Sequence, residues 1–460
     1  MALAFLDRDR SVASPGYSRW LVPPAALAIH LSIGQVYSFS VFKNPLLALR
    51  AADGSSWNLE QVGYIFSIAI AFLGISAALF GAWLEKAGPR RAMFYAACCF
   101  GAGFVVAALG ARTHSLWLLY LGYGVIGGIG LGLGYISPVS TLIKWFPDRP
   151  GLATGLAIMG FGGGAMIGGP LASSLMAYFK ADGLLAIPYA MITMGVVYFL
   201  FMMFGVFTIR VPESGWKPAG WEPSAKHSAL ITTHDVAVST AWKTPQFWLL
   251  WIMLFANVTA GIGILEQAAP MIQDFFKGSI TAIAAVGFVG LLSIFNMAGR
   301  FFWAPVSDFI GRKWTYAIFF TLGAVLYFLL PFTREDKLGS VPLFVAMSVV
   351  IISMYGGGFA TLPAYLKDLF GVFNVSAIHG RLLTAWSLAG IVGPLIVNGI
   401  LDYYIGHRLP KEDAYPIIMH IMCGLLGVGF LANLMVRPVA ARAWLKQDDR
   451  QVIGTEAAAH

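Results

Sequence analysis

Long apolar stretches, separated by short polar turns, run along almost the whole chain. Each is close to the roughly 20 residues that cross the hydrocarbon core of a membrane as a helix. We expect twelve spanning helices, at approximately 21–45, 61–84, 91–111, 117–143, 151–178, 187–209, 246–272, 280–306, 314–332, 341–366, 377–402 and 415–436. The pattern therefore predicts an all-α membrane protein.

The longest polar interval separates the first six stretches from the last six. It runs from Arg210 to Lys243 and is rich in proline, serine, tryptophan and charge. We divide the chain into an N-terminal six-helix bundle at 1–209, a cytoplasmic linker at 210–245 and a C-terminal six-helix bundle at 246–460 that ends in a short cytoplasmic tail.

The two halves repeat the same polar motifs. An acid, a glycine and a base recur 223 positions apart: Glu85, Gly88 and Arg90 match Asp308, Gly311 and Lys313. A Gly-Pro-Leu sequence at 169–171 recurs at 393–395. Paired six-helix halves are typical of alternating-access carriers, whose site lies near the membrane midplane between the halves. Glycines spaced by four residues on the fourth and fifth stretches, as at Gly128 and Gly164, predict close helix packing.

Composition and charge support this architecture. Hydrophobic residues make up 58% of the 460 residues and charged residues 11%, against roughly 25% charged residues in a soluble domain. About two thirds of the 30 lysines and arginines fall in the termini and in the turns on the same side, which predicts that both termini are cytoplasmic. This asymmetry facing an anionic leaflet accounts for the net charge of +8 without a nucleic-acid partner.

The sequence carries no Walker-type phosphate loop, catalytic pair or metal-ligand cluster, and its three cysteines match no metal or disulfide spacing. We therefore expect no enzyme activity, no cofactor and no metal site. Energy for transport would come from an ion or substrate gradient.

Arg300 is the clearest functional candidate, because an ionisable residue inside a span is costly to bury. It precedes Asp308 by eight residues, so it lies roughly 12 Å deeper along a helix, close to the middle of a core about 30 Å thick. Its planar guanidinium suits a carboxylate, which predicts a small organic anion as substrate. The alternative is a structural arginine bound to helix carbonyls or to an acidic partner.

Four further residues are candidates for coupling or gating. A histidine ordinarily titrates near neutrality, so His30 could carry a proton, although a hydrogen-bonded core histidine is equally consistent. Glu266 lies towards the outer end of the seventh span, as a proton site or as a solvated residue. His379 and Arg381 begin the eleventh span, as a cytoplasmic gate or as interfacial anchors.

The repeated loops resemble the signature segments of the major facilitator superfamily. The resemblance implies that Glu85, Arg90, Asp308 and Lys313 form a gate latch at the cytoplasmic helix ends, with ordinary interfacial charge as the alternative. Residues 130–135, 144–149 and 151–155 are similar to the oxalate/formate antiporter family, a branch near the monocarboxylate transporters. So are residues 34–38, 44–45, 244–248 and 300–303.

This resemblance implies a substrate site. The family lines its chamber at positions that match Tyr37, Tyr135 and Tyr355, and binds carboxylate with an arginine that matches Arg300. The oxalate carrier adds a lysine on the eleventh helix, where this chain has Trp386. One buried cation matches a monocarboxylate, so we expect a lactate, pyruvate or formate carrier working by proton symport or anion exchange.

Other functions remain open from the sequence. An oxalate/formate-type dicarboxylate antiporter or a carrier of another small anion is the first alternative, and a transporter-like membrane sensor is a remote one. We expect a monomer in a bacterial inner membrane, with a small organic anion, protons and the lipid bilayer as its partners.

Overall fold

The computed structural model describes residues 4–51, 54–181, 185–213, 215–222, 230–232 and 234–445. Within these ranges the regular structure is helical, and the β-type contacts are isolated bridges. Eleven helices are long and apolar enough to cross a membrane, and a bent helix pair at the start gives twelve. The expectation of an all-α chain with about twelve spans is confirmed.

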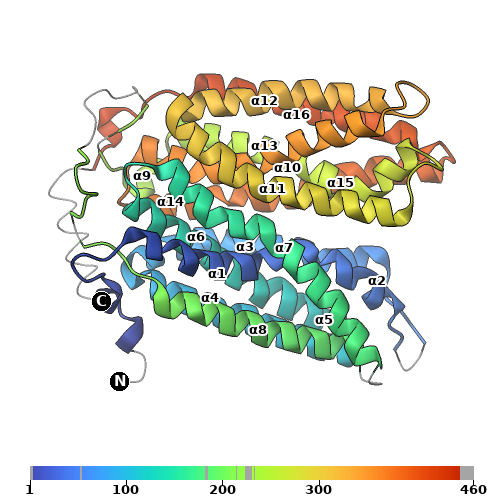
Figure 1. Cartoon of the computed structure of the whole chain (residues 1–460), viewed down its shortest axis with the longest axis horizontal. Helices are drawn as coiled ribbons and strands as arrows, with labels where there is room; N and C mark the ends of the chain where they lie inside the picture. Colours follow the sequence, from blue (N-terminus) through green and yellow to red (C-terminus); the bar gives the residue numbers. More distant parts are fainter. Residues whose placement is uncertain are drawn as a thin grey trace.

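The N-terminal bundle is the lower half of Figure 1. It contains α1 (Pro23–Ile33), α2 (Ser40–Ala48), α3 (Leu59–Ala87), α4 (Pro89–Arg112), α5 (Leu116–Leu119), α6 (Gly127–Trp145), α7 (Pro150–Ala181) and α8 (Ala186–Thr208). A 3-10 turn at Gly34–Ser38 separates α1 from α2, and the span bends there by 46°. A π-helical segment at Tyr120–Ile126 joins α5 to α6.

The C-terminal bundle is the upper half of Figure 1. It contains α10 (Pro245–Phe275), α11 (Ala282–Ile310), α12 (Arg312–Leu329), α13 (Val341–Phe370), α14 (Val375–Leu382), α15 (Thr384–Gly406) and α16 (Ala414–Met435). The short helix α9 (Val238–Ala241) lies in the linker. Thr244 caps α10 by accepting a hydrogen bond from the Phe247 N–H, and Pro245 occupies the first turn.

The repeated glycines have one backbone role in both halves. Gly88 ends α3 with φ 84°, and Gly311 ends α11 with φ 88°. A side chain is disfavoured in this left-handed region, so glycine is required where one long helix turns into the next. The sequence repeat is thus a repeat of helix–turn–helix geometry.

Glycines inside the helices allow close packing, as their spacing predicted. A methyl group at Gly164 of α7 would lie 2.6 Å from the Gly34 Cα, and one at Gly128 of α6 would lie 2.7 Å from the Ala69 carbonyl oxygen. Both positions therefore place helix backbones in direct contact.

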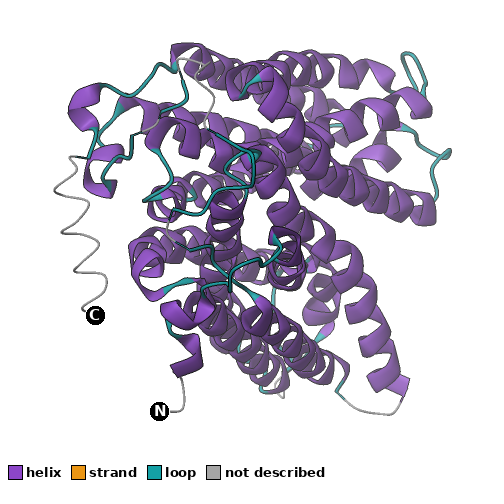
Figure 2. Ribbon diagram, turned by 60° about the vertical axis from the view of Figure 1, so that its left-hand side comes forward, coloured by secondary structure: helices purple, strands orange, loops and turns teal. Residues whose placement is uncertain are grey.

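The two bundles pack together at the end of the molecule where the described part of the chain begins and ends, the left-hand end of Figure 1. We call this end the terminal side. Here α3 packs against α14, and α7 packs against α11. A methyl group at Gly81 would lie 2.9 Å from the Ala377 Cα, across the two halves. Towards the opposite side the bundles diverge (Figure 2), so the structure is closed on the terminal side.

Candidate functional site

Arg300 lies where the two halves meet, on α11, and its side chain is completely buried. Its Nε donates to the Asn296 Oδ1 at 3.2 Å, and one terminal nitrogen donates to the Ile158 carbonyl oxygen of α7 at 3.3 Å. In the described part of the chain no ion pair joins Arg300 to an acidic side chain. A buried guanidinium without a counter-ion is costly, and an anion bound here would supply the missing charge.

Aromatic rings enclose the guanidinium. Its carbon lies 5.7 Å from the ring centre of Phe161 on α7 and 5.3 Å from that of Phe359 on α13. Cation–π attraction of this kind stabilises the charge without neutralising it. Trp386 of α15 contacts both phenylalanine rings, with ring centres 5.3 Å and 4.6 Å away.

Three buried polar groups at this junction have no hydrogen-bond partner among the residues that the structure describes. They are the Arg300 Nη2, the Tyr135 hydroxyl and the Trp386 Nε1. The rings of Tyr135 and Trp386 have centres 5.3 Å apart. Each of the three can donate a hydrogen bond, so the structure gathers unused donors around a single positive charge. This arrangement suits an anion with further acceptor oxygens.

A pair of tyrosines connects the halves beside this cluster. The hydroxyls of Tyr37 and Tyr355 lie 3.3 Å apart, within hydrogen-bonding distance. Tyr355 is 2% exposed, whereas Tyr37, on the 3-10 turn after α1, is only partly buried. Tyr37 also contacts Trp386, with ring centres 6.4 Å apart. All five residues expected to bind substrate are therefore linked by contacts to one site.

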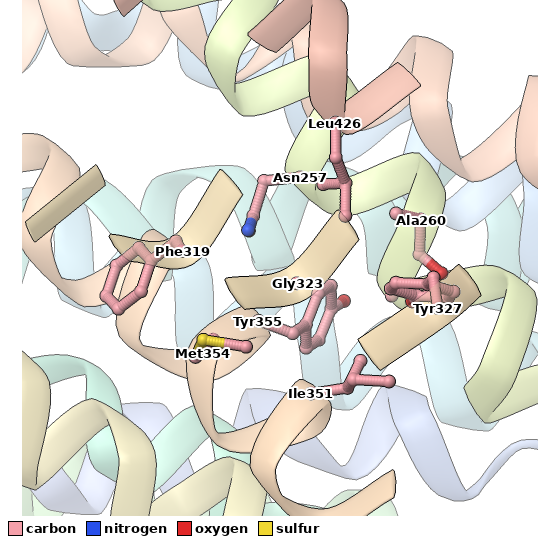
Figure 3. Close-up of a pocket in the computed structure, with 10 residues that line it drawn as sticks. Asn257, Ala260, Phe319, Gly323, Tyr327, Ile351, Met354, Tyr355 and Leu426 are labelled. Carbon is pink, nitrogen blue, oxygen red and sulfur yellow. The ribbon is translucent and has the colours of Figure 1, made fainter. Parts of the chain in front are cut away.

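A cavity of ≈ 10 Å³, room for about one water molecule, lies beside Tyr355 within the C-terminal half. Figure 3 shows Tyr355 and Tyr327 at this cavity, with the Asn257 side chain near them. The lining of this cavity includes Tyr355 and none of the groups that surround the Arg300 guanidinium.

The histidines lie on the terminal side of the cluster. Both ring nitrogens of His30 face backbone carbonyls: Nδ1 lies against the Ala157 oxygen, and Nε2 is 3.1 Å from the Tyr135 oxygen. His379 is buried across the interface, with its ring centre 5.8 Å from that of Tyr135. Arg381 instead donates to the Val238 carbonyl of the linker at 3.0 Å. The Glu266 side chain is outside the part that the structure describes.

The two repeated carboxylates cap helices of the opposite half. Asp308 of α11 accepts from the Gly151 and Leu152 amides at the start of α7, at 2.9 and 3.0 Å. Glu85 of α3 accepts from the Ser376 amide at the start of α14 at 3.1 Å. A carboxylate is favourable at a helix N-terminus, where amides lack partners and the dipole is positive. These contacts hold the terminal side closed.

The repeated bases do not join these carboxylates. Arg90 donates to the carbonyls of Phe5, Arg10 and Ile209, which ties the N-terminal segment to the end of α8. Lys313 donates to the Leu434 and Val436 carbonyls at the end of α16. Both bases therefore act within their own half, in contrast to the latch role expected from the repeat.

Other residues supply the positive charge of the latch. Lys144 of α6 pairs with Glu85 at 3.0 Å. Arg312 pairs with Asp308 at 2.5 Å and with Asp368 at 3.0 Å. Arg312 directly precedes Lys313, the base that the repeat predicted. The motif therefore indicated the correct segment, but the neighbouring residue makes the ion pair. Phe161 and Phe359 were also missed, because aromatic residues are too common in this chain to stand out.

The described part of the chain was also compared with the requirements of a metal site. Among the described residues, no group of three or more histidine, cysteine, aspartate or glutamate side chains could hold a metal ion.

Comparison with known proteins places this geometry in a family. The family model of the Major Facilitator Superfamily matches residues 16–302 and 270–454. The chain belongs to the major facilitator superfamily. It is therefore an integral membrane protein that transports a solute, and it is not an enzyme.

Relatives of known name fit this membership. The chain is 28% identical over 378 residues to the oxalate:formate antiporter of Oxalobacter formigenes, covering 82% of this chain and 83% of that one. It is 24% identical over 383 residues to apicoplast pyruvate carrier 1 of Toxoplasma gondii, covering 72% and 68%. The solved structure of the human organic anion transporter MFSD10 superposes with a TM-score of 0.64 at 14% identity, covering 92% and 100%. That likeness shows the major facilitator fold.

Proposed function

We propose that this major facilitator protein is a secondary transporter of a small monocarboxylate of the lactate, pyruvate or formate type. The supporting observation is Arg300, a fully buried cation at the junction of the halves that pairs with no acid among the described residues. A carboxylate supplies the missing charge and accepts from the unused Nη2. Pyruvate transport is also the named activity of one relative.

Trp386 supports one carboxylate rather than two. It is fully buried and lies among Tyr37, Tyr135 and Phe161. A dianion bound here would bring a second negative charge into apolar surroundings without a second cation, which is unfavourable. The indole N–H can still donate to a neutral acceptor such as a carbonyl or hydroxyl oxygen.

Transport would proceed by alternating access around this site. With both termini in the cytoplasm of a bacterium, the closed terminal side makes this the outward-facing arrangement. Substrate then enters from outside and binds at Arg300, and the bundles rock about the junction to open the terminal side. The motive force is a proton carried by His30 or a second anion moving the other way.

Uptake into proteoliposomes tests the proposal. We expect radiolabelled lactate, pyruvate or formate to accumulate, and Arg300→Lys to reduce uptake at least tenfold because an ammonium lacks the planar fork. Arg112→Lys, at an exposed helix end, is the matched control and should behave as wild type.

Two results would contradict the proposal. One is the absence of uptake of all three acids, and the other is wild-type uptake by the Arg300→Lys protein. Uptake of oxalate in exchange for formate would favour the runner-up, a dicarboxylate antiporter like the relative from Oxalobacter formigenes.

A further inference from the structure

Ser387 of α15 makes an unusual contact with α3 of the other half. Its hydroxyl accepts from the Gly74 amide at 3.1 Å and donates to the Ile70 carbonyl oxygen at 2.8 Å. Residues 70 and 74 are four apart on one α-helix, so these are the two groups that the helix itself pairs. The Ser387 hydroxyl thus contacts both groups of one rung in the hydrogen-bond ladder of α3, which runs as one α-helix from Leu59 to Ala87.

Glycine at position 74 makes this contact possible. A methyl group there would lie 2.1 Å from the Ser387 hydroxyl oxygen and 2.8 Å from the Leu383 carbonyl oxygen. Both atoms belong to the C-terminal half, so the missing side chain serves the contact between the halves rather than the fold of the N-terminal bundle. Ser387 is 8% exposed, so the contact is shielded from water.

We propose that the Ser387–Gly74 contact is a reversible rung that stabilises the closed terminal side and breaks without leaving an unpaired polar group. When the halves separate, the Gly74 N–H and the Ile70 C=O are left facing each other within α3 and satisfy one another as in any helix. Most buried hydrogen bonds leave unsatisfied partners when broken, at a substantial cost. This exchange avoids that cost on the α3 side, so it lowers the barrier to opening.

The position of the rung connects it to substrate binding. Ser387 follows Trp386 on α15, and the next turn of the same helix places Gly390 against Ile70. A ligand that displaces the Trp386 ring therefore moves the residue that holds the rung. The inference rests on the alternating access proposed above and names the contact that changes when the site is occupied.

Distances between the halves on the terminal side test the rung. Spin labels on cysteines at Lys86 and Trp314, both exposed, report closure by pulsed electron resonance, in a background without the three native cysteines. We expect Ser387→Ala to raise the population of molecules with the long distance, relative to those with the short distance, about fivefold. This is the effect of losing one net hydrogen bond. Ser76→Ala is the matched control, since that hydroxyl bonds within the N-terminal half.

Gly74→Ala gives a second, stronger change. The three atoms nearest to the new methyl group all belong to the opposite half, so the bundle should fold normally while the long distance becomes predominant. Gly63→Ala, on the same helix with no atom within 4 Å of the added methyl, should leave the distances unchanged.

Distances that stay at wild-type values in both variants would overturn the proposal. So would equal shifts in the variants and in their controls. The measurement needs no substrate, so it reports on the rung even if the uptake assay identifies none of the expected acids.

Discussion

Trp386 occupies the position that decides substrate charge in the proposed site. We predict that Trp386→Lys raises the ratio of oxalate to lactate uptake tenfold or more, about 1.4 kcal/mol, because a second cation balances a second carboxylate. Competition uptake in proteoliposomes measures the ratio. Trp386→Phe, which keeps a ring and adds no charge, should leave it near wild type. A lysine variant that transports with an unchanged ratio would contradict the role of Trp386.

His30 is the residue proposed to carry the coupled proton. Both of its ring nitrogens face backbone carbonyl oxygens, those of Ala157 and Tyr135, which holds the imidazole beside the substrate cluster. We predict that a proton gradient accelerates wild-type uptake and that His30→Gln abolishes the acceleration. His420→Gln, at an exposed position, is the control, and an intact response in the His30 variant would assign the proton elsewhere.

Residues were predictable from the sequence where their chemistry conflicts with their surroundings. Arg300 stood out because a charge within an apolar stretch is rare and expensive. Phe161 and Asn296 did not, since a phenylalanine or asparagine in a span has many ordinary uses and only packing shows which one applies.

Helix α7 depends on glycine for its fit against the turn that follows α1. A methyl group at Gly34 would lie 2.4 Å from the Phe161 carbonyl oxygen, and backbone cannot easily give way. We predict that Gly34→Ala lowers the free energy of unfolding by about 1–3 kcal/mol, measured as a lower melting temperature of the purified protein. Gly63→Ala should be neutral or stabilising by up to about 1 kcal/mol, as expected for alanine in a helix. Equal losses in both variants would remove the steric explanation.

At the level of elements, the sequence predicted the spans well because helix length is set by the membrane. The partners of the helix ends were harder to predict. Arg90 and Lys313 follow a left-handed glycine that turns the chain, so each base points back into its own bundle. The sequence pattern contains the glycine and the base, but it does not show toward which bundle the side chain of the base is directed.

The molecule as a whole should stop working when its terminal side is fixed. Gly81 and Ala377 face each other across the halves, in direct backbone contact. We predict that the protein with cysteines at both positions, and without the native ones, loses transport on oxidation and regains it on reduction. Each single-cysteine protein is the control. Persistent transport by the cross-linked protein would argue against opening on this side.

The conformational state could not be predicted from the sequence. One sequence has to support both closed and open terminal sides, with only a few kcal/mol between them. The repeat indicates two halves that move against each other. Only the structure shows at which end of the molecule the two halves are in contact.

Asp308 and Glu85 each cap a helix that belongs to the other half. When the terminal side opens, the first amides of α7 and α14 lose these oxygens and must be hydrated instead. Opening therefore takes up water, and the balance between the two states depends on how available that water is. Solutes that are excluded from protein surfaces should favour the closed arrangement, which would make this carrier responsive to osmotic conditions as well as to its substrate.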